Sequence, residues 1–200
     1  MLGAKFDEAL QLAHELHRSQ TRKQTAVPYI AHLMAVVGIV LEAYAYHQFD
    51  NIEDVAIGAL LHDAVEDQGH KISLAKIRER FGDTVHDIVR DCTDAVIEEE
   101  GQKKAPWRER KEAYIAHVGS KPHESLIVST ADKLHNARSI LFDHGKVGEK
   151  VWNRFKASKE ETIWYYESLL AAFAKAWPDN PLLSDFGAAV ERLREAAGCN

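Results

Sequence analysis

The stretch ALLHDAVEDQ, residues 59–68, passes directly from apolar side chains into ionisable ones. His62, Asp63, Glu66 and Asp67 lie within six positions, and residues three and four apart share one face of an α-helix. If a single helix continues through the stretch, the imidazole and the three carboxylates form one polar wedge beside a buried segment. Burying three carboxylates together is costly unless a cation or hydrogen bonds compensate their charge.

A simpler interpretation is that the helix ends here, with solvated acidic residues in its last turn. The helix dipole weakens this interpretation, because it disfavours anions at a helix C-terminus. A single His-Asp pair nevertheless occurs often by chance. The stretch alone therefore leaves open whether it forms a metal site or a solvated helix end.

Apolar residues recur at helical spacing along nearly the whole chain, and no alternating pattern typical of a strand is present. The sequence therefore predicts an all-α fold, a bundle of mostly short helices in a single domain spanning residues 1–200. The apolar stripes that carry this prediction lie at residues 6–16, 33–44, 55–60, 85–92 and 126–134.

The remaining boundaries follow from proline positions and charge runs. The stripe at 126–134 is expected to begin near Pro122, since proline suits a first helical turn. A longer helix is expected over about residues 148–177, where Pro178 ends it, and Pro181 opens a short terminal helix. Loops are expected at residues 21–28 and 98–111.

The composition restricts the class of partner. The chain has 200 residues and a formal net charge of −6, so no basic excess is available to bind duplex DNA by counterion release. A phosphorylated small molecule needs only a local positive patch. The longest apolar run, residues 33–41, is about half of the roughly 20 residues that a membrane span needs. The N-terminus lacks the apolar run of a signal peptide. Two cysteines, Cys92 and Cys199, are too few for a disulfide framework. We expect a soluble cytoplasmic protein that binds neither nucleic acid nor membranes, of undetermined oligomeric state.

Two other segments favour the metal interpretation of the opening stretch. His32 begins the second apolar stripe, and Asp132 interrupts the apolar face of the stripe at 126–134. With His62 and Asp63 they supply two imidazoles and two carboxylates from three helices. Without a thiolate, this set disfavours structural zinc and suits Mn²⁺, Fe²⁺ or Co²⁺ while tolerating Zn²⁺. A divalent cation there would activate water for attack on phosphorus.

The arrangement H…HD…D resembles the HD superfamily of metal-dependent phosphohydrolases. Three segments narrow the resemblance to the hydrolase domain of the RelA/SpoT family, in which the patterns are HxxQxRK…PYxxH, HDxxED and ADKLxNxR. The matching segments are HRSQTRKQTAVPYIAH at 17–32, LLHDAVED at 60–67 and ADKLHNARS at 131–139, and FGDTVHDIVRDCTD at 81–94 matches a further family segment. The chain resembles a stand-alone small alarmone hydrolase with an HD-domain helical bundle and its core motifs within residues 17–139.

This resemblance implies a guanosine 3′,5′-bis(diphosphate) 3′-pyrophosphohydrolase, which converts (p)ppGpp to GDP or GTP and pyrophosphate, usually with Mn²⁺. The implied metal ligands are His32, His62, Asp63 and Asp132. Glu66 and Asp67 match the pair that activates or orients the attacking water. Arg22, Lys23, Asn136 and Arg138 match positions near the substrate, although Arg138 could instead form a structural ion pair. His135 is expected just behind the metal ligands, and His17 and Gln20 are expected to order the loop that carries Arg22.

Several points stay open from the sequence alone. The basic run at residues 103–111 could form an electrostatic lid or a solvated loop, and Trp107 could stack on a base or anchor that loop. The spacer QTAV and Ser139, where the long enzymes commonly carry threonine, leave the base preference between guanine and adenine undecided. Rival functions are an HD hydrolase of another nucleotide, such as an adenosine alarmone or a nucleoside monophosphate, and a non-catalytic nucleotide-binding module.

Overall fold

The computed structural model describes residues 1–94 and 105–199, and in these ranges the regular secondary structure is helical. The all-α prediction is confirmed: the described residues contain one isolated antiparallel bridge, Thr21–Pro28, and no strand. Nor does any helix in these ranges combine the length and the apolar character that crossing a membrane would require. The helices are α1 (Ala4–Leu16), α2 (Ile30–Ala43), α3 (Ile52–Leu61), α4 (Ala64–Gln68), α5 (Leu74–Phe81), α6 (Asp83–Cys92), α7 (Trp107–His117), η1 (Val118–Ser120), α8 (His123–Val147), η2 (Gly148–Arg154), α9 (Lys159–Ala176) and α10 (Leu183–Ala197).

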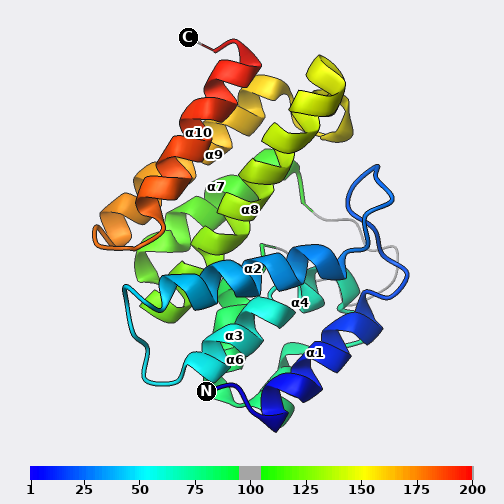
Figure 1. Cartoon of the computed structure of the whole chain (residues 1–200), viewed down its shortest axis with the longest axis vertical. Helices are drawn as coiled ribbons and strands as arrows, with labels where there is room; N and C mark the ends of the chain where they lie inside the picture. Colours follow the sequence, from blue (N-terminus) through cyan, green and yellow to red (C-terminus); the bar gives the residue numbers. More distant parts are fainter. Residues whose placement is uncertain (95–104, 200) are drawn as a thin grey trace.

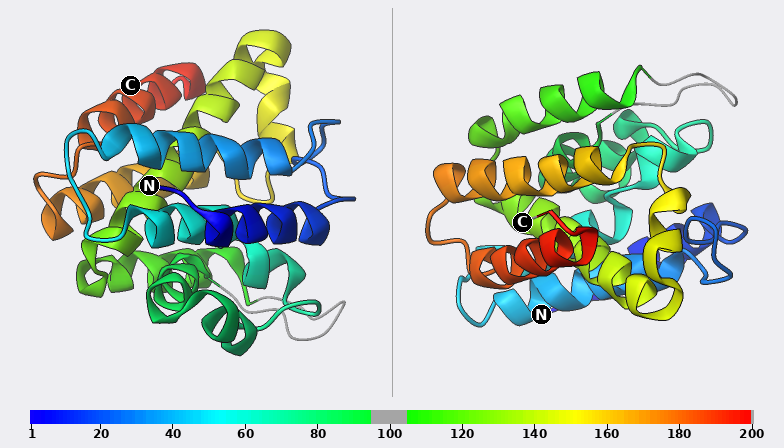
Figure 2. Two further views of the ribbon diagram at one scale, coloured as in Figure 1. Left: turned by 60° about the horizontal axis from the view of Figure 1, so that its bottom comes forward. Right: turned by 90° about the horizontal axis from the view of Figure 1, so that it is seen from above.

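Helix α8 is the longest element and joins two groups of helices. It packs against α2, α3 and α6 on the N-terminal side and against α10 on the C-terminal side. In Figure 1 it runs diagonally between the blue and cyan helices and the orange and red pair. The right-hand view of Figure 2 shows α7, α9 and α10 side by side, with α9 in the middle. Residues of α8 can therefore face the N-terminal helices and the C-terminal layer at once.

Helix α3 is the most deeply buried element, and all its residues from Asp54 to Leu61 are buried. It lies against α1, α2, α6 and α8. Gly58 permits the contact with α6, because a Cβ there would lie 2.6 Å from Cγ2 of Ile88. The side chain of Asn51 caps the start of the helix by accepting a hydrogen bond from the backbone N–H of Asp54. The helix thus carries the residues that follow Leu61 into the interior.

Two boundary predictions are wrong. The single helix expected over residues 148–177 is divided into η2 and α9, because Ser158 and Glu161 form a capping box that starts a new helix. The loop expected at 98–111 does not include residues 107–111, since α7 begins at Trp107; residues 98–104 lie outside the described ranges. Helix α5, whose N-cap Ser73 accepts from Lys76 N–H, was not expected at all.

Lys121, which follows η1, is an unusual buried ammonium. Among the residues that the structure describes, its Nζ has no hydrogen-bond partner, and it lies 3.6 Å from the centroid of the Tyr114 ring. Burial lowers the pKa of Lys121 to about 8, against the opposing effects of Cys92 and Asp91 and with a further lowering by Lys133. The cation–π contact therefore compensates the lost hydration only in part.

We predict that Lys121→Met raises the free energy of unfolding at pH 7 by about 1 to 3 kcal/mol, since one pKa unit corresponds to about 1.4 kcal/mol. The unfolded lysine, with a pKa of about 10.4, binds its proton more tightly than the folded one. The stability of the unsubstituted protein should therefore rise between pH 8 and roughly 10.4, and the advantage of methionine should vanish above that range. Urea unfolding across this pH range, with the exposed Lys175→Met as control, measures it. An unchanged or lower stability of Lys121→Met at pH 7 would contradict the prediction.

Candidate active site

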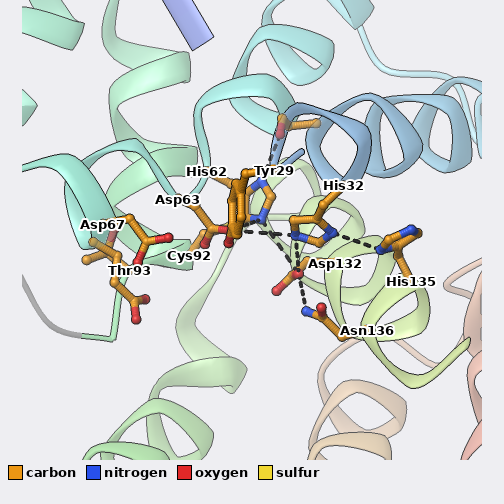
Figure 3. Close-up of polar contacts among 12 residues, drawn as sticks. Tyr29, His32, His62, Asp63, Asp67, Cys92, Thr93, Asp132, His135 and Asn136 are labelled. Atoms are coloured by element: carbon orange, nitrogen blue, oxygen red, sulfur yellow. Dashed lines mark hydrogen bonds and ion pairs between the residues drawn. The ribbon is translucent and has the colours of Figure 1, made fainter. Parts of the chain in front are cut away.

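Three elements bring the four residues of the H…HD…D pattern together. His32 lies in the first turn of α2, and Asp132 lies in α8. His62 and Asp63 occupy the junction between α3, which ends at Leu61, and α4, which begins at Ala64. The sequence left open whether one helix continues through residues 59–68, and the structure shows that it is interrupted at the two residues that enter the cluster. Figure 3 shows their side chains converging on one point.

The four side chains meet through two imidazole nitrogens and two carboxylate oxygens. His62 Nε2 lies 3.1 Å from Asp63 Oδ2 and 3.6 Å from Asp132 Oδ1. His32 Nε2 lies 3.5 Å and 3.2 Å from the same two oxygens. Both histidines are 1% exposed, and within the described part of the chain neither Nε2 has a hydrogen-bond partner. Two buried nitrogens thus face two carboxylate oxygens at ion-pair distance, in directions that do not suit a hydrogen bond.

This arrangement fits a divalent cation. Two donors bound about 2.1 Å from one ion lie roughly 3.0 Å apart at an octahedral angle and about 3.4 Å apart at a tetrahedral angle. The four nitrogen–oxygen separations, from 3.1 to 3.6 Å, fall near these values. The ligand atoms of His32, His62 and Asp63 also lie within 4.8 Å of one another. A cation would provide the partner that both Nε2 atoms lack.

The cluster requires positive charge. Burial opposes ionisation of Asp63, but His62 and His32 hold the pKa of that carboxyl well below its usual range. Burial likewise opposes ionisation of Asp132, and Lys133 with the two histidines holds its pKa well below its usual range. Against burial, Asp63 and Asp132 raise the pKa of His62 well above its ordinary value. Lys133 Nζ lies 2.5 Å from Asp132 Oδ2 and supplies part of this charge.

Each of the four side chains also makes a hydrogen bond to a residue outside the cluster, and such outer contacts orient metal ligands. His135 contacts His32 as the sequence predicted. Tyr29 was not predicted, although its position three residues before His32 in a helical segment was a usable signal. The pairs are Tyr29 Oη to Asp63 Oδ2 (2.6 Å), His62 Nδ1 with the Ala59 carbonyl (2.8 Å), His32 Nδ1 with His135 Nδ1 (2.8 Å) and Asn136 Nδ2 to Asp132 Oδ1 (2.5 Å).

Glu66 and Asp67 lie on α4, just beyond the cluster, and Asp67 is visible on one side of it in Figure 3. Glu66 Oε2 accepts from the backbone N–H of Asp94 at 3.3 Å. Asp67 Oδ2 accepts from Gln20 Nε2 at 2.8 Å. Both carboxylates line cavities that open beside the cluster. The two residues therefore face the same cleft, each with its own protein partner.

Asp94 is held by an ion-pair cluster that the sequence did not predict. Its two carboxylate oxygens each lie 2.5 Å from a cation of α7, Arg110 Nη1 and Lys111 Nζ. Although burial opposes it, these cations lower the pKa of Asp94 to about 2. The basic run at 103–111 thus contributes a clamp behind Glu66 in its described part, whereas residues 103 and 104 lie outside the described ranges. Trp107 packs its ring against Trp164 and Tyr165 of α9 and so anchors the start of α7.

The loop between α1 and α2 presents Arg22 and Lys23. Backbone hydrogen bonds from Arg22 N to Val27 O (2.8 Å) and from Tyr29 N to Gln20 O (2.9 Å) close this loop. The prediction of a loop at residues 21–28 is confirmed. His17 Nδ1 lies 2.7 Å from Gln20 Oε1, and the His17 ring stacks on Tyr29. His17 and Gln20 therefore order this loop as expected, while Gln20 also reaches Asp67.

The predicted substrate residues separate into two groups. Arg22 Nη2 donates to Asn136 Oδ1 at 2.7 Å, so these two meet beside Asp132. Lys23 Nζ lies 5.6 Å from the Phe155 ring centroid, on the wall of the same cleft. Arg138 instead forms an exposed ion pair with Asp185 of α10, at 2.6 Å. The structure thus contains the ion pair that was the alternative for Arg138, while Arg138 also lines a cavity with Arg22 and His135.

Two adjoining cavities of about 410 and 420 Å³ flank the cluster, and each is large enough for part of a nucleotide. The first contains Arg22, Asp67 and Asn136 in its wall, and the second contains Glu66 and Lys111. The residues common to both walls are Lys23, Ile140, Phe155 and Tyr166. Together they form a cleft with acidic groups at the cluster and basic groups around it.

Comparisons with known proteins agree with this geometry. The profile described as HD domain matches residues 9–163. The guanosine-3′,5′-bis(diphosphate) 3′-pyrophosphohydrolase MESH1 of Drosophila melanogaster is 34% identical over 140 residues, which cover 69% of this chain and 70% of the relative. The protein of that name from Danio rerio is 34% identical over 136 residues, 66% of this chain and 67% of the relative.

Two solved structures are also similar to this chain. One, described as a metazoan orthologue of SpoT that hydrolyses ppGpp, superposes with a TM-score of 0.72 at 25% identity and covers 100% of this chain and 99% of that one. A protein from Listeria monocytogenes superposes with a TM-score of 0.65 at 29% identity, covering 80% of this chain and 96% of that one. The similarity to the metazoan structure therefore includes the C-terminal helices, which the sequence motifs do not reach.

We predict that Asp63→Ala abolishes binding of a divalent cation, because it removes one of the two oxygens that both buried Nε2 atoms face. Glu66→Ala, one turn along on α4, should retain the cation while losing most turnover. Metal content after dialysis against Mn²⁺ and a calorimetric titration of the metal-stripped protein measure the first effect, with Asp50→Ala at an exposed position as control. Unchanged binding by Asp63→Ala, with intact helical circular dichroism, would contradict the ligand set.

Proposed function

The chain belongs to the HD-domain family, and from this premise we propose that it is a metal-dependent guanosine 3′,5′-bis(diphosphate) 3′-pyrophosphohydrolase that converts (p)ppGpp to GDP or GTP and pyrophosphate. The observation that carries the proposal is the position of Glu66 and Asp67, which line a basic cleft next to the His-Asp cluster. Relatives that bear this activity in their names are 34% identical over two thirds of the chain. The chain is accordingly a hydrolase.

In this proposal His32, His62, Asp63 and Asp132 hold the cation, and the proposed ion is Mn²⁺, one of several divalent ions that suit nitrogen and oxygen donors without a thiolate. When bound, such an ion lowers the pKa of water and neutralises charge on a phosphoryl oxygen. The outer hydrogen bonds from Tyr29 and the other partners keep the ligands oriented. They support a site that is formed before the metal arrives.

Glu66 and Asp67 would act on the attacking water. One carboxylate accepts a proton as the water oxygen forms a bond to the phosphorus attached at the 3′ position. The bond from that phosphorus to the 3′ oxygen breaks, the 3′ oxygen is protonated, and pyrophosphate leaves. The contact of Asp94 N–H with Glu66 Oε2, held by Arg110 and Lys111, supports a fixed orientation for the Glu66 carboxylate.

Arg22, Lys23 and Asn136 would contact the nucleotide. A guanidinium can stack on a base or form a bidentate contact with phosphate, and an ammonium adds a point charge. Arg22 and Asn136 already contact each other on the wall of the first cavity. Both groups therefore lie where a substrate whose 3′ phosphate reached the cluster would pass.

A second phosphate chain on the substrate would meet positive charges in the second cavity, of about 420 Å³. Lys23, Lys111 and Lys156 all line it. Burial lowers the pKa of Lys23, and the charges of Lys156 and Lys111 lower it further, so both lysines are close enough to repel the Lys23 ammonium group. An anion between them would relieve this repulsion, which supports a substrate that carries phosphate at both the 3′ and the 5′ position.

We also propose a domain organisation, a partner and a cellular location for this activity. We propose that residues 1–200 act as a single HD phosphohydrolase domain, since α10 packs on both α8 and α9. A small-molecule nucleotide is the proposed partner, without nucleic acid or membrane. Cys92 and Cys199 are both free thiols, which suits a reducing cytoplasm.

The test of the function is product analysis on a panel of nucleotides. Incubation with Mn²⁺ and 3′-pyrophosphorylated guanosine and adenosine nucleotides should release pyrophosphate and leave the corresponding 5′-phosphorylated nucleoside with a free 3′ hydroxyl. The guanosine and adenosine arms then reveal the base preference. Orthophosphate from nucleoside 5′-monophosphates, without pyrophosphate from the panel, would contradict the proposal in favour of another HD nucleotide hydrolase.

We predict that Lys156→Gln raises KM for guanosine 3′,5′-bis(diphosphate) about three- to ten-fold at nearly constant kcat, as expected for an exposed charge that binds ground state and transition state equally. Guanosine 3′-diphosphate, which lacks the 5′ phosphates, should show no such change. Lys150→Gln, at another exposed lysine, is the matched control. An equal effect of Lys156→Gln on both substrates would mean that Lys156 does not contact the 5′ phosphates.

A further inference from the structure

His135 makes an unusual contact with one member of the cluster. It lies on α8, three residues after Asp132, and its Nδ1 is 2.8 Å from Nδ1 of His32. The ring centroids are 4.8 Å apart and the planes are tilted by 42°. In Figure 3 the His32 ring lies between Asp132 and His135, with interactions drawn to both. One imidazole thus bridges the cluster and a second imidazole.

Only one hydrogen can occupy this contact. Two N–H groups facing each other would repel, as would two lone pairs, so one Nδ1 donates and the other accepts. His32 Nε2 is buried and faces Asp63 Oδ2 and Asp132 Oδ1. If that nitrogen binds the cation, as the proposed function requires, it carries no hydrogen. The hydrogen of the neutral His32 ring must then be on Nδ1, and His135 Nδ1 must be the acceptor.

The two histidines of the cluster differ in how this tautomer is secured. His62 Nδ1 lies 2.8 Å from the backbone carbonyl of Ala59, which can only accept a hydrogen bond. His32 depends instead on the side chain of another residue, which is able to donate or accept. The tautomer of His32 is therefore determined by residue 135, and a substitution there can change it without altering any ligand.

We propose that His135 is a positioning residue for the metal site, a role that rests on the proposed function. Its Nδ1 accepts the Nδ1 hydrogen of His32, fixing the tautomer and ring orientation that present His32 Nε2 to the cation. His135 then carries its own hydrogen on Nε2. His135 and His32 both line a third cavity of about 400 Å³, whose wall shares Arg22 and Ser139 with the first cavity.

Three variants separate this role from ordinary packing. His135→Phe keeps an aromatic ring but removes the acceptor. His135→Asn places an amide oxygen close to the position of the histidine Nδ1 and should restore the acceptor. His117→Phe, at an exposed histidine of α7, is the matched control for loss of an imidazole.

The first measurement is titration of metal-stripped protein with Mn²⁺, followed by electron paramagnetic resonance. Loss of an outer hydrogen bond typically weakens metal affinity about 10- to 100-fold, so His135→Phe should show a loss in that range. His135→Asn should stay within about three-fold of the unsubstituted protein, and His117→Phe should be unchanged. Equal Mn²⁺ affinity in His135→Phe and the unsubstituted protein would overturn the proposal, as would failure of His135→Asn to recover affinity while remaining folded.

The second measurement is the tautomer itself, read from long-range nitrogen–hydrogen correlations of ¹⁵N-labelled histidines in the Zn²⁺-loaded and metal-stripped forms. In the Zn²⁺-loaded form, His32 should show hydrogen on Nδ1 in the unsubstituted protein and in His135→Asn. A hydrogen on His135 Nδ1 in the Zn²⁺-loaded unsubstituted protein would overturn the proposal. Absence of cation binding by the unsubstituted protein would contradict the proposed function instead, and the tautomer measurement would still decide the direction of the His32–His135 hydrogen bond.

Discussion

Two carboxylates packed against two buried imidazoles form the constraint on which the rest of this structure depends. Asp63 and Asp132 approach both Nε2 atoms within 3.1 to 3.6 Å. Both imidazoles and Asp132 are buried, and Asp63 is partly buried. Burial opposes ionisation of both carboxyls, so the cluster is stable only if positive charge lies within or beside it. Lys133 supplies one such charge from the rear. The opposite side, where both nitrogens lack a hydrogen-bond partner among the described residues, is where a cation fits.

Helices α3 and α4 contribute to the site in different ways. Helix α3 is buried over its whole central length, and the absence of a side chain at Gly58 lets it pack closely on Ile88. Its end at Leu61 turns His62 and Asp63 toward α2 and α8 rather than along a continuous helix face. Helix α4 then carries the next acidic pair into the cleft. The interruption of the helix thus separates His62 and Asp63, which enter the cluster, from Glu66 and Asp67, which line the cleft.

The parts of this site that could be predicted are those encoded by residue type. A histidine and a carboxylate that interrupt apolar stripes, as His32 and Asp132 do, conflict with local burial and so indicate a site. The contact of Tyr29 with Asp63, 34 positions apart, and the clamp of Asp94 by α7 depend on tertiary packing, which helical periodicity does not encode. One local signal was present but was not used. Apolar spacing predicted a continuous helix over residues 148–177, whereas Ser158 and Glu161 form a capping box inside this segment.

Hydrogen bonds of Asn136 connect the His-Asp cluster with the loop that carries Arg22. Its amide nitrogen donates to Asp132 Oδ1, while its amide oxygen accepts from Arg22. One planar amide therefore joins Arg22, on the wall of the cleft, to Asp132 in the cluster. Since both bonds use the same amide plane, the orientation that suits Arg22 also sets the direction from which Asp132 receives its hydrogen bond.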